Sequence, residues 1–123
     1  MNLIERLEKA EGPSRELADE VLLACGWTQP IKTIYGESGR VWQHPKGPWS
    51  FNERPNPMED MNEAIELVPE GWLPNLDTFR SDGNVKYTWL LWKPDNREGH
   101  NTGTHANIAL ALCIACLRAR GIE

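Results

Sequence analysis

A short polar segment near the C-terminal end has the residue types of an anion-binding site. It runs from Glu98 to His105 and precedes a long apolar stretch. Thr104 is a suitable N-cap for a helix that starts there, and the free N–H groups and the dipole of a helix N-terminus favour a phosphate or carboxylate. The candidate ligand-binding residues in this segment are Gly99, His100, Asn101, Thr102, Gly103 and Thr104. The alternative is a surface loop with an ordinary threonine cap.

A second candidate site is a stretch rich in proline and tryptophan between residues 42 and 54. It interleaves aromatic rings with cations, as a surface that stacks a base and holds a phosphate does. Its candidate ligand-binding residues are Trp42, His44, Lys46, Trp49 and Arg54, joined by Lys93 and Arg97 from a later hairpin. The alternative is that the rings cover the hydrophobic core while the cations reach past them to solvent.

No residue pattern of a known catalytic or metal site stands out. Cys113 and Cys116 are spaced as Cys-x-x-Cys, but they lie in an apolar stretch without a second pair, which predicts buried, free thiols. The sequence has neither a His-Glu-x-x-His pattern nor a Gly-x-Ser-x-Gly elbow. We therefore expect a protein without cofactor, metal or catalytic residues. Acid–base chemistry stays open if Glu53, Asp95 or Glu98 meets a histidine in space.

These candidate residues must be positioned by an α+β fold, because helical and strand periodicities alternate along the chain. We expect helices over 2–11, 14–25, 57–68 and 104–120, hairpins within 27–44 and 72–93, and loops at 44–57 and 94–103. A lone hairpin is marginally stable, and the last helix is apolar on most of its circumference. We therefore predict one domain, residues 1–123, with a four-stranded, mainly antiparallel sheet covered by helices in a sandwich-like order α-α-β-β-α-β-β-α.

Local signals mark where several of these elements begin and end. Capping and turn preferences predict a stop at Gly12-Pro13, an N-cap at Ser14, a left-handed end at Gly26, a helix start at Asn56-Pro57 and a tight turn at Asp82-Gly83-Asn84. We expect a further turn from Gly36 to Gly39 in the first hairpin.

Charge limits the partners. The 123 residues carry 13 Lys and Arg against 18 Asp and Glu, a net charge of −5, which argues against a duplex-DNA binder with a uniformly basic surface. Residues 31–58 and 78–100 nevertheless hold eight cations against five acids, so an anionic ligand belongs on the hairpin side. The charged N-terminal segment lacks the apolar core of a signal peptide, and no apolar run reaches membrane-spanning length. We expect a cytoplasmic protein that binds no membrane.

Three segments carry a family resemblance. They are Gly-Pro-Ser-Arg-Glu-Leu at 12–17 with the Gly26-Trp27 pair, Glu-Ala-Ile-Glu-Leu-Val-Pro-Glu-Gly-Trp at 63–72, and the apolar run at 109–120. Together they resemble the phage ABA sandwich family of small bacteriophage proteins. The resemblance implies a single domain with a sheet between helical layers, encoded by a phage or prophage and acting in the bacterial cytoplasm. It implies no catalytic residues.

The expected function is therefore binding. Our leading hypothesis is a non-enzymatic phage accessory protein that sequesters a small anionic, nucleotide-derived immune signal, using stacking rings, a few cations and helix-end amides. Assembly into a homo-oligomer would help to enclose such a ligand. The alternative is an inhibitor or adaptor that binds a host protein through its exposed rings.

Overall fold

The computed structural model describes residues 2–45, 49–50, 56–94 and 96–122, with side chains except at residues 32, 34, 49, 50, 81 and 96–100. The helices are α1 (Leu3–Lys9), α2 (Arg15–Ala24), α3 (Met61–Ile65) and α4 (Ile108–Ala119). The strands are β1 (Ile31–Ile34), β2 (Glu37–Arg40), β3 (Trp42–Gln43), β4 (Trp49–Ser50), β5 (Leu73–Ser81), β6 (Asn84–Lys93) and β7 (Asn96–His105). The predicted α+β class is confirmed.

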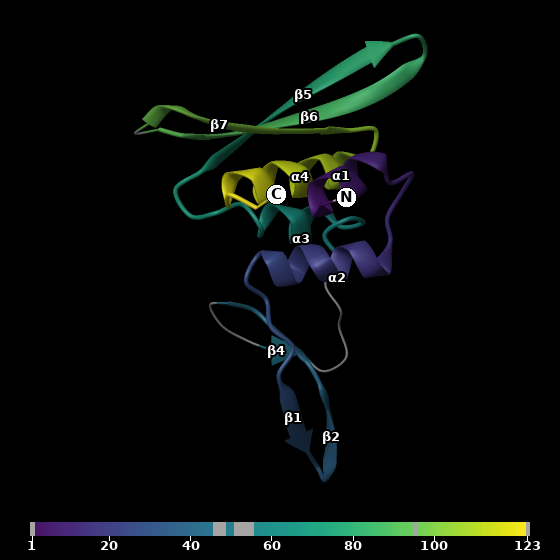
Figure 1. The fold of residues 1–123 in the computed structure, drawn as a ribbon, viewed down its shortest axis with the longest axis vertical. Coiled ribbons are helices and arrows are strands. Elements are labelled where there is room, and N and C mark those ends of the chain that lie inside the picture. Colours follow the sequence, from purple (N-terminus) through teal and green to yellow (C-terminus); the bar gives the residue numbers. More distant parts are fainter. Residues whose placement is uncertain (1, 46–48, 51–55, 95, 123) are drawn as a thin grey trace.

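Helix α4 lies at the centre of the fold. Every residue from Ala109 to Leu117 is buried, because β6 and β7 cover one side of the helix and α1, α2 and α3 pack around the other. Figure 1 shows this layering, with the sheet above α4 and the remaining helices beside and below it. Burying each large aliphatic side chain contributes roughly 1.5–3 kcal/mol. An apolar helix surrounded in this way is the main part of the hydrophobic core.

The sheet over α4 is antiparallel, in the order β5-β6-β7. Its β5–β6 hairpin turns at Asp82 and Gly83, whose φ angles of 52° and 81° suit a two-residue turn that follows the strand twist. The predicted second hairpin is thus confirmed. Trp89 and Leu91 of β6 point onto α4 and are buried, and the Trp89 indole Nε1 donates to the Ile108 carbonyl oxygen at 3.0 Å.

Several local predictions about helix ends are also confirmed. The Ser14 hydroxyl caps α2 by accepting from the Leu17 backbone N–H, and Gly26 follows that helix with a φ of 98°. The third helix differs from its prediction. Residues 57–59 form a turn, Asp60 is the N-cap, and α3 ends at Ile65 instead of residue 68. Asn56 still accepts from the Met58 N–H, but it caps this turn and not the helix.

The predicted single four-stranded sheet is wrong. The described strands form a three-stranded sheet and two two-stranded ribbons, β1–β2 and β3–β4. Figure 1 gives the physical reason: α2, α3 and α4 lie between the first hairpin and the three-stranded sheet, so the strands cannot pair. The described helices all lie on one side of that sheet, whereas a sandwich has cover on both.

The predicted loop over 94–103 is also wrong, because residues 96–103 belong to β7, which pairs with β6 from Tyr87↔His105 to Lys93↔Asn96. The last helix accordingly starts later than expected, with Asn107 and not Thr104 as its N-cap; the Asn107 side chain accepts from the N–H groups of Ala109 and Leu110. Small polar residues are weak strand formers. The segment forms a strand because the open edge of β6 offers hydrogen-bond partners for its backbone, although its own residues do not favour a strand.

The structure has no helix, within the described residues, of the length and apolarity needed to cross a membrane.

Gly103→Ala should destabilise the fold by about 1–3 kcal/mol, the usual cost of overpacking. The added Cβ would meet backbone atoms of Ala111 and Ala115 and the Ile114 side chain, where α4 lies directly on β7. Urea unfolding measures the effect. Gly12→Ala is the matched control, since a Cβ there meets nothing within 4 Å. Equal unfolding midpoints for the two variants would contradict this close packing.

Candidate functional site

Trp42, a predicted ligand-binding residue, belongs to the core. Its side chain is only 4% exposed, and the Trp27 ring packs on it edge to face at 6.4 Å between centroids. The prediction that Trp42 stacks a ligand is therefore wrong: an indole at the start of a short strand is drawn into the apolar interior. Trp42 and the buried Val41 instead anchor the root of the first hairpin.

The other predicted residue of this stretch with a described side chain, His44, lies against Trp27. The two rings are 5.0 Å apart and nearly perpendicular, and both are half-buried. They line a hollow of about 420 Å³. Arg120 at the end of α4 also lines it, while donating to the Leu67 carbonyl oxygen at 3.0 Å. We call this the Trp27 hollow; it is the described site that brings rings and a cation together.

Charge in this hollow does not favour an anion. Its lining includes Glu66 and Glu70 as well as Arg120. The same mixture recurs in two further hollows of the described chain, where Arg118 accompanies Glu5 and Glu8 and where Lys86 accompanies Asp82. A phosphate placed beside any of these cations would also lie near a carboxylate, which opposes binding.

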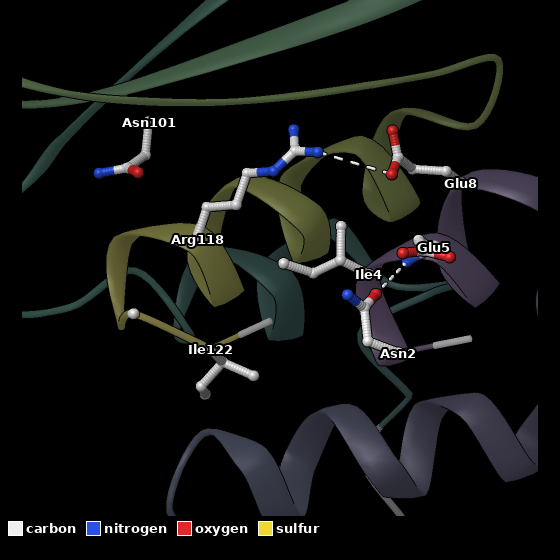
Figure 2. A pocket seen from close by; sticks show the side chains of 8 residues that line it. Asn2, Ile4, Glu5, Glu8, Asn101, Arg118 and Ile122 are labelled. Carbon is white, nitrogen blue, oxygen red and sulfur yellow. Dashed lines mark hydrogen bonds and ion pairs between the residues drawn. The ribbon is translucent and has the colours of Figure 1, made fainter.

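Arg118 serves a structural purpose in its hollow of about 460 Å³ (Figure 2). Its guanidinium approaches the Glu8 carboxylate at 3.5 Å and donates to the Thr102 carbonyl oxygen at 2.8 Å. Asn101, a predicted ligand-binding residue, lines the same hollow. Arg118 thus ties α4 to α1 and to the outer strand β7.

The proposed helix-end anion site does not form. Residues 99–104 lie inside β7, with partners that run from Trp92↔His100 to Thr88↔Thr104. The missing side chain at Gly103 lets α4 pack closely on β7, so the space beside this glycine is filled by the helix and not by a ligand. The prediction placed these residues at a helix N-terminus, but Asn107 occupies that position.

The remaining predicted residues are not brought together by the described part of the structure. Lys46 and Arg54 lie outside the described residues. Trp49 is in β4 opposite Gln43, and Arg97, Gly99 and His100 are in β7, all without described side chains. The Lys93 ammonium lies 5.0 Å from the centre of the Trp72 ring, which is a cation–π contact within its own part of the chain.

Sequence reasoning missed the feature with the greatest exposure. Strands β1 and β2 form a ribbon, here called the arm, that projects away from the helices (Figure 1). Tyr35 at its tip is fully exposed at 101%, and Ile31 is 69% exposed. Among the described residues, neither strand has an extensive contact with any helix or strand except its own partner.

The arm turns at Tyr35 and Gly36, with φ angles of 52° and 80°, and not between Gly36 and Gly39 as expected. A bulky residue in the left-handed region costs of order 1 kcal/mol or more, and asparagine usually takes this position in a two-residue hairpin turn. The signal available in the sequence was the Tyr35-Gly36 pair, with glycine at a turn position between two runs of β-type residues.

The predicted free thiols are confirmed. Cys25, Cys113 and Cys116 are free and buried, and burial raises the pKa of all three. These thiols are therefore unsuited to nucleophilic chemistry near neutral pH. No group of three or more metal-binding side chains gathers within the part of the chain that the structure describes.

Comparison with known proteins adds no relative: no family model, no curated protein and no solved structure matches this chain.

Stability should fall as the pH rises above about 8.5, the ordinary pKa of an exposed thiol. Burial raises the pKa of Cys25 to about 11 in the folded state. The unfolded chain therefore loses this proton first, and the stability contributed by the thiol is lost progressively toward pH 11. Urea midpoints across this range measure the fall.

Cys25→Ala is the comparison variant. It should lower the midpoint at neutral pH through lost packing, yet show a shallower decline above about pH 8.5. A decline as steep as that of the unaltered protein would contradict the assignment.

Proposed function

We propose that this protein is a non-enzymatic binding protein, an inhibitor or adaptor that contacts a host protein through the arm. The observation that carries the proposal is the exposure of Tyr35 and Ile31 on a ribbon that projects from the helices (Figure 1). Tyrosine is enriched at the centres of protein interfaces, because its ring buries a large area at a small cost in side-chain entropy. In line with the family resemblance, the proposed place of action is the cytoplasm of a bacterial host.

The energetics of the arm favour a partner. An isolated two-stranded ribbon is at best marginally stable in water. Here its root is held by the Val41 N–H donating to the Pro30 carbonyl oxygen and by the backbone pair Thr28↔Gln43, while among the described residues the tip is paired only with itself. A partner that packs on the tip or adds a strand to a free edge would bury apolar surface and satisfy backbone groups.

Tyr35→Asn should weaken partner binding without loss of stability. Asparagine tolerates the left-handed backbone, so the turn persists or becomes more stable while the ring is removed. Capture from host extract with the unaltered protein and with the variant, followed by calorimetry on the purified partner, measures the effect. We expect affinity to fall at least about tenfold, as for a hot-spot residue.

Leu76→Ser is the matched control, because Leu76 is another exposed apolar side chain, on strand β5 at the opposite end of the molecule. It should leave this affinity unchanged. If the Tyr35 variant retains the partner at full affinity, the arm is not the contact surface.

We infer a second candidate function, capture of a small nucleotide-derived immune signal, from the Trp27 hollow. Two half-buried rings and Arg120 meet there, next to Pro45. A ring-bearing ligand could stack beside Trp27 while its anionic group reaches Arg120. We rank this function second because the nearby carboxylates of Glu66 and Glu70 would repel an anionic ligand.

Incubation with a cyclic nucleotide signal, followed by heating, tests this candidate. Release of intact nucleotide supports capture, and chemical conversion of the nucleotide indicates an enzyme. If no nucleotide is retained, binding to a host protein is the favoured function. The exposed Glu66 lies in the hollow, so Glu66→Gln should tighten retention, whereas Glu59→Gln outside it should not. Equal retention of the nucleotide by both variants would show that any ligand binds outside this hollow.

A further inference from the structure

The face of the three-stranded sheet that points away from α4 forms a surface of its own, here called the open face. Because Trp89, Leu91 and Gly103 lie toward α4, their strand neighbours and the partners of those neighbours point the other way. The described side chains of the open face are Leu73, Asn75, Asp77, Phe79, Lys86, Thr88, Leu90, Trp92, Thr102 and Thr104.

The open face exposes apolar side chains. Leu73 is 44% and Phe79 55% exposed, and Leu90 and Trp92 are half-buried in the same face. All of the described helices lie on the other side of the sheet (Figure 1). The register places Leu73, Leu90 and Trp92 together at one end of the face, with Phe79 on the far side of the Asp77↔Thr88 pair. Exposed apolar side chains on one face of a small protein mark an interaction surface.

The two edges of the sheet are less suited to association than its face. On β7, the Thr102 carbonyl oxygen already accepts from Arg118. On β5, Pro74 has no N–H to donate. A partner strand added at either edge would therefore lack a backbone hydrogen bond at one position. Contacts on the open face are made by side chains and do not depend on those backbone groups.

Charge on the open face indicates what covers it. Asp77 and Lys86 are the charged side chains at its described strand positions, where they lie on neighbouring strands, one step apart diagonally; Asp82 adds a carboxylate at the turn beside Lys86. The strand positions of the face are thus balanced in charge, in a chain whose net charge is −5. A twofold axis between these two residues sets each carboxylate opposite the ammonium of the other copy, which is the self-complementarity that a symmetric dimer requires.

We propose that the open face is a homodimer interface, in which Asp77 pairs with the partner's Lys86 and Lys86 with the partner's Asp77. At the hairpin turn, Phe79, Asp82, Asn84 and Lys86 line a hollow of about 180 Å³ next to this face. The apolar groups supply the affinity, and the two ion pairs set the register.

This dimer is independent of the proposed function, since the arm lies at the far end of the molecule from the open face (Figure 1). Joining two open faces places the two arms at opposite ends of the assembly. A dimer therefore presents two binding tips, which raises avidity for a partner that carries two sites.

Sedimentation or light scattering over a concentration series tests the dimer on the full chain. The unaltered protein should dimerise, and Asp77→Lys and Lys86→Asp should each raise the dimer dissociation constant at least about tenfold, because each variant sets like charges opposite one another. The double variant D77K/K86D recreates two attractive pairs and should return the constant to within about threefold of the original.

Leu73→Ser and Leu76→Ser form a matched pair, because the two leucines are 44% and 40% exposed on opposite faces of the same strand. The first should weaken the dimer and the second should not, while urea unfolding confirms that both fold. A protein that stays monomeric up to about 0.5 mM would overturn the proposal. A dimer that responds equally to both leucine variants, or to neither charge reversal, would also overturn it.

Discussion

The burial of α4 is the constraint on which the rest of the structure depends. A helix that is apolar around its circumference has no face for solvent, so it needs cover on all sides. The sheet covers one side, at a distance short enough to require glycine at position 103, and α1, α2 and α3 cover the others. Every described helix is therefore placed on one side of the sheet (Figure 1). The opposite face, with its exposed leucine and phenylalanine side chains, is the direct consequence.

The tryptophans show how the same constraint decides the candidate site. Trp89 completes the contact between sheet and helix, and its indole N–H finds the Ile108 carbonyl oxygen, as a buried indole requires. Trp42 is buried at the root of the arm, with Trp27 packed on its edge. Rings that hold the core together cannot also stack on a ligand. The geometry for capturing an anion is correspondingly weak, so the contacts that we rank first lie on the arm and the open face.

The arm and the open face offer different kinds of contact. The arm is narrow and carries a tyrosine in a strained turn, features that suit insertion into a recess of another protein. The open face is broad and balanced in charge, which suits a second copy of the same surface. Because the two lie at opposite ends of the molecule, both contacts can form at once.

The sequence by itself determined the features that depend on neighbouring residues. The helix cap at Ser14, the left-handed end at Gly26 and the turn at Asp82-Gly83 all follow from preferences that act within a few residues, and the amphipathic spacing of α2 acts over three turns. The free, buried state of Cys113 and Cys116 follows from their place in an apolar helical run. Only the tertiary structure decided that the polar segment 96–105 becomes a strand, that Trp42 turns inward, and that the first hairpin stays apart from the sheet. Those outcomes depend on which strand edge, helix or apolar surface a segment meets after folding. Residues far away in the sequence form these neighbouring surfaces, so local preferences cannot predict them.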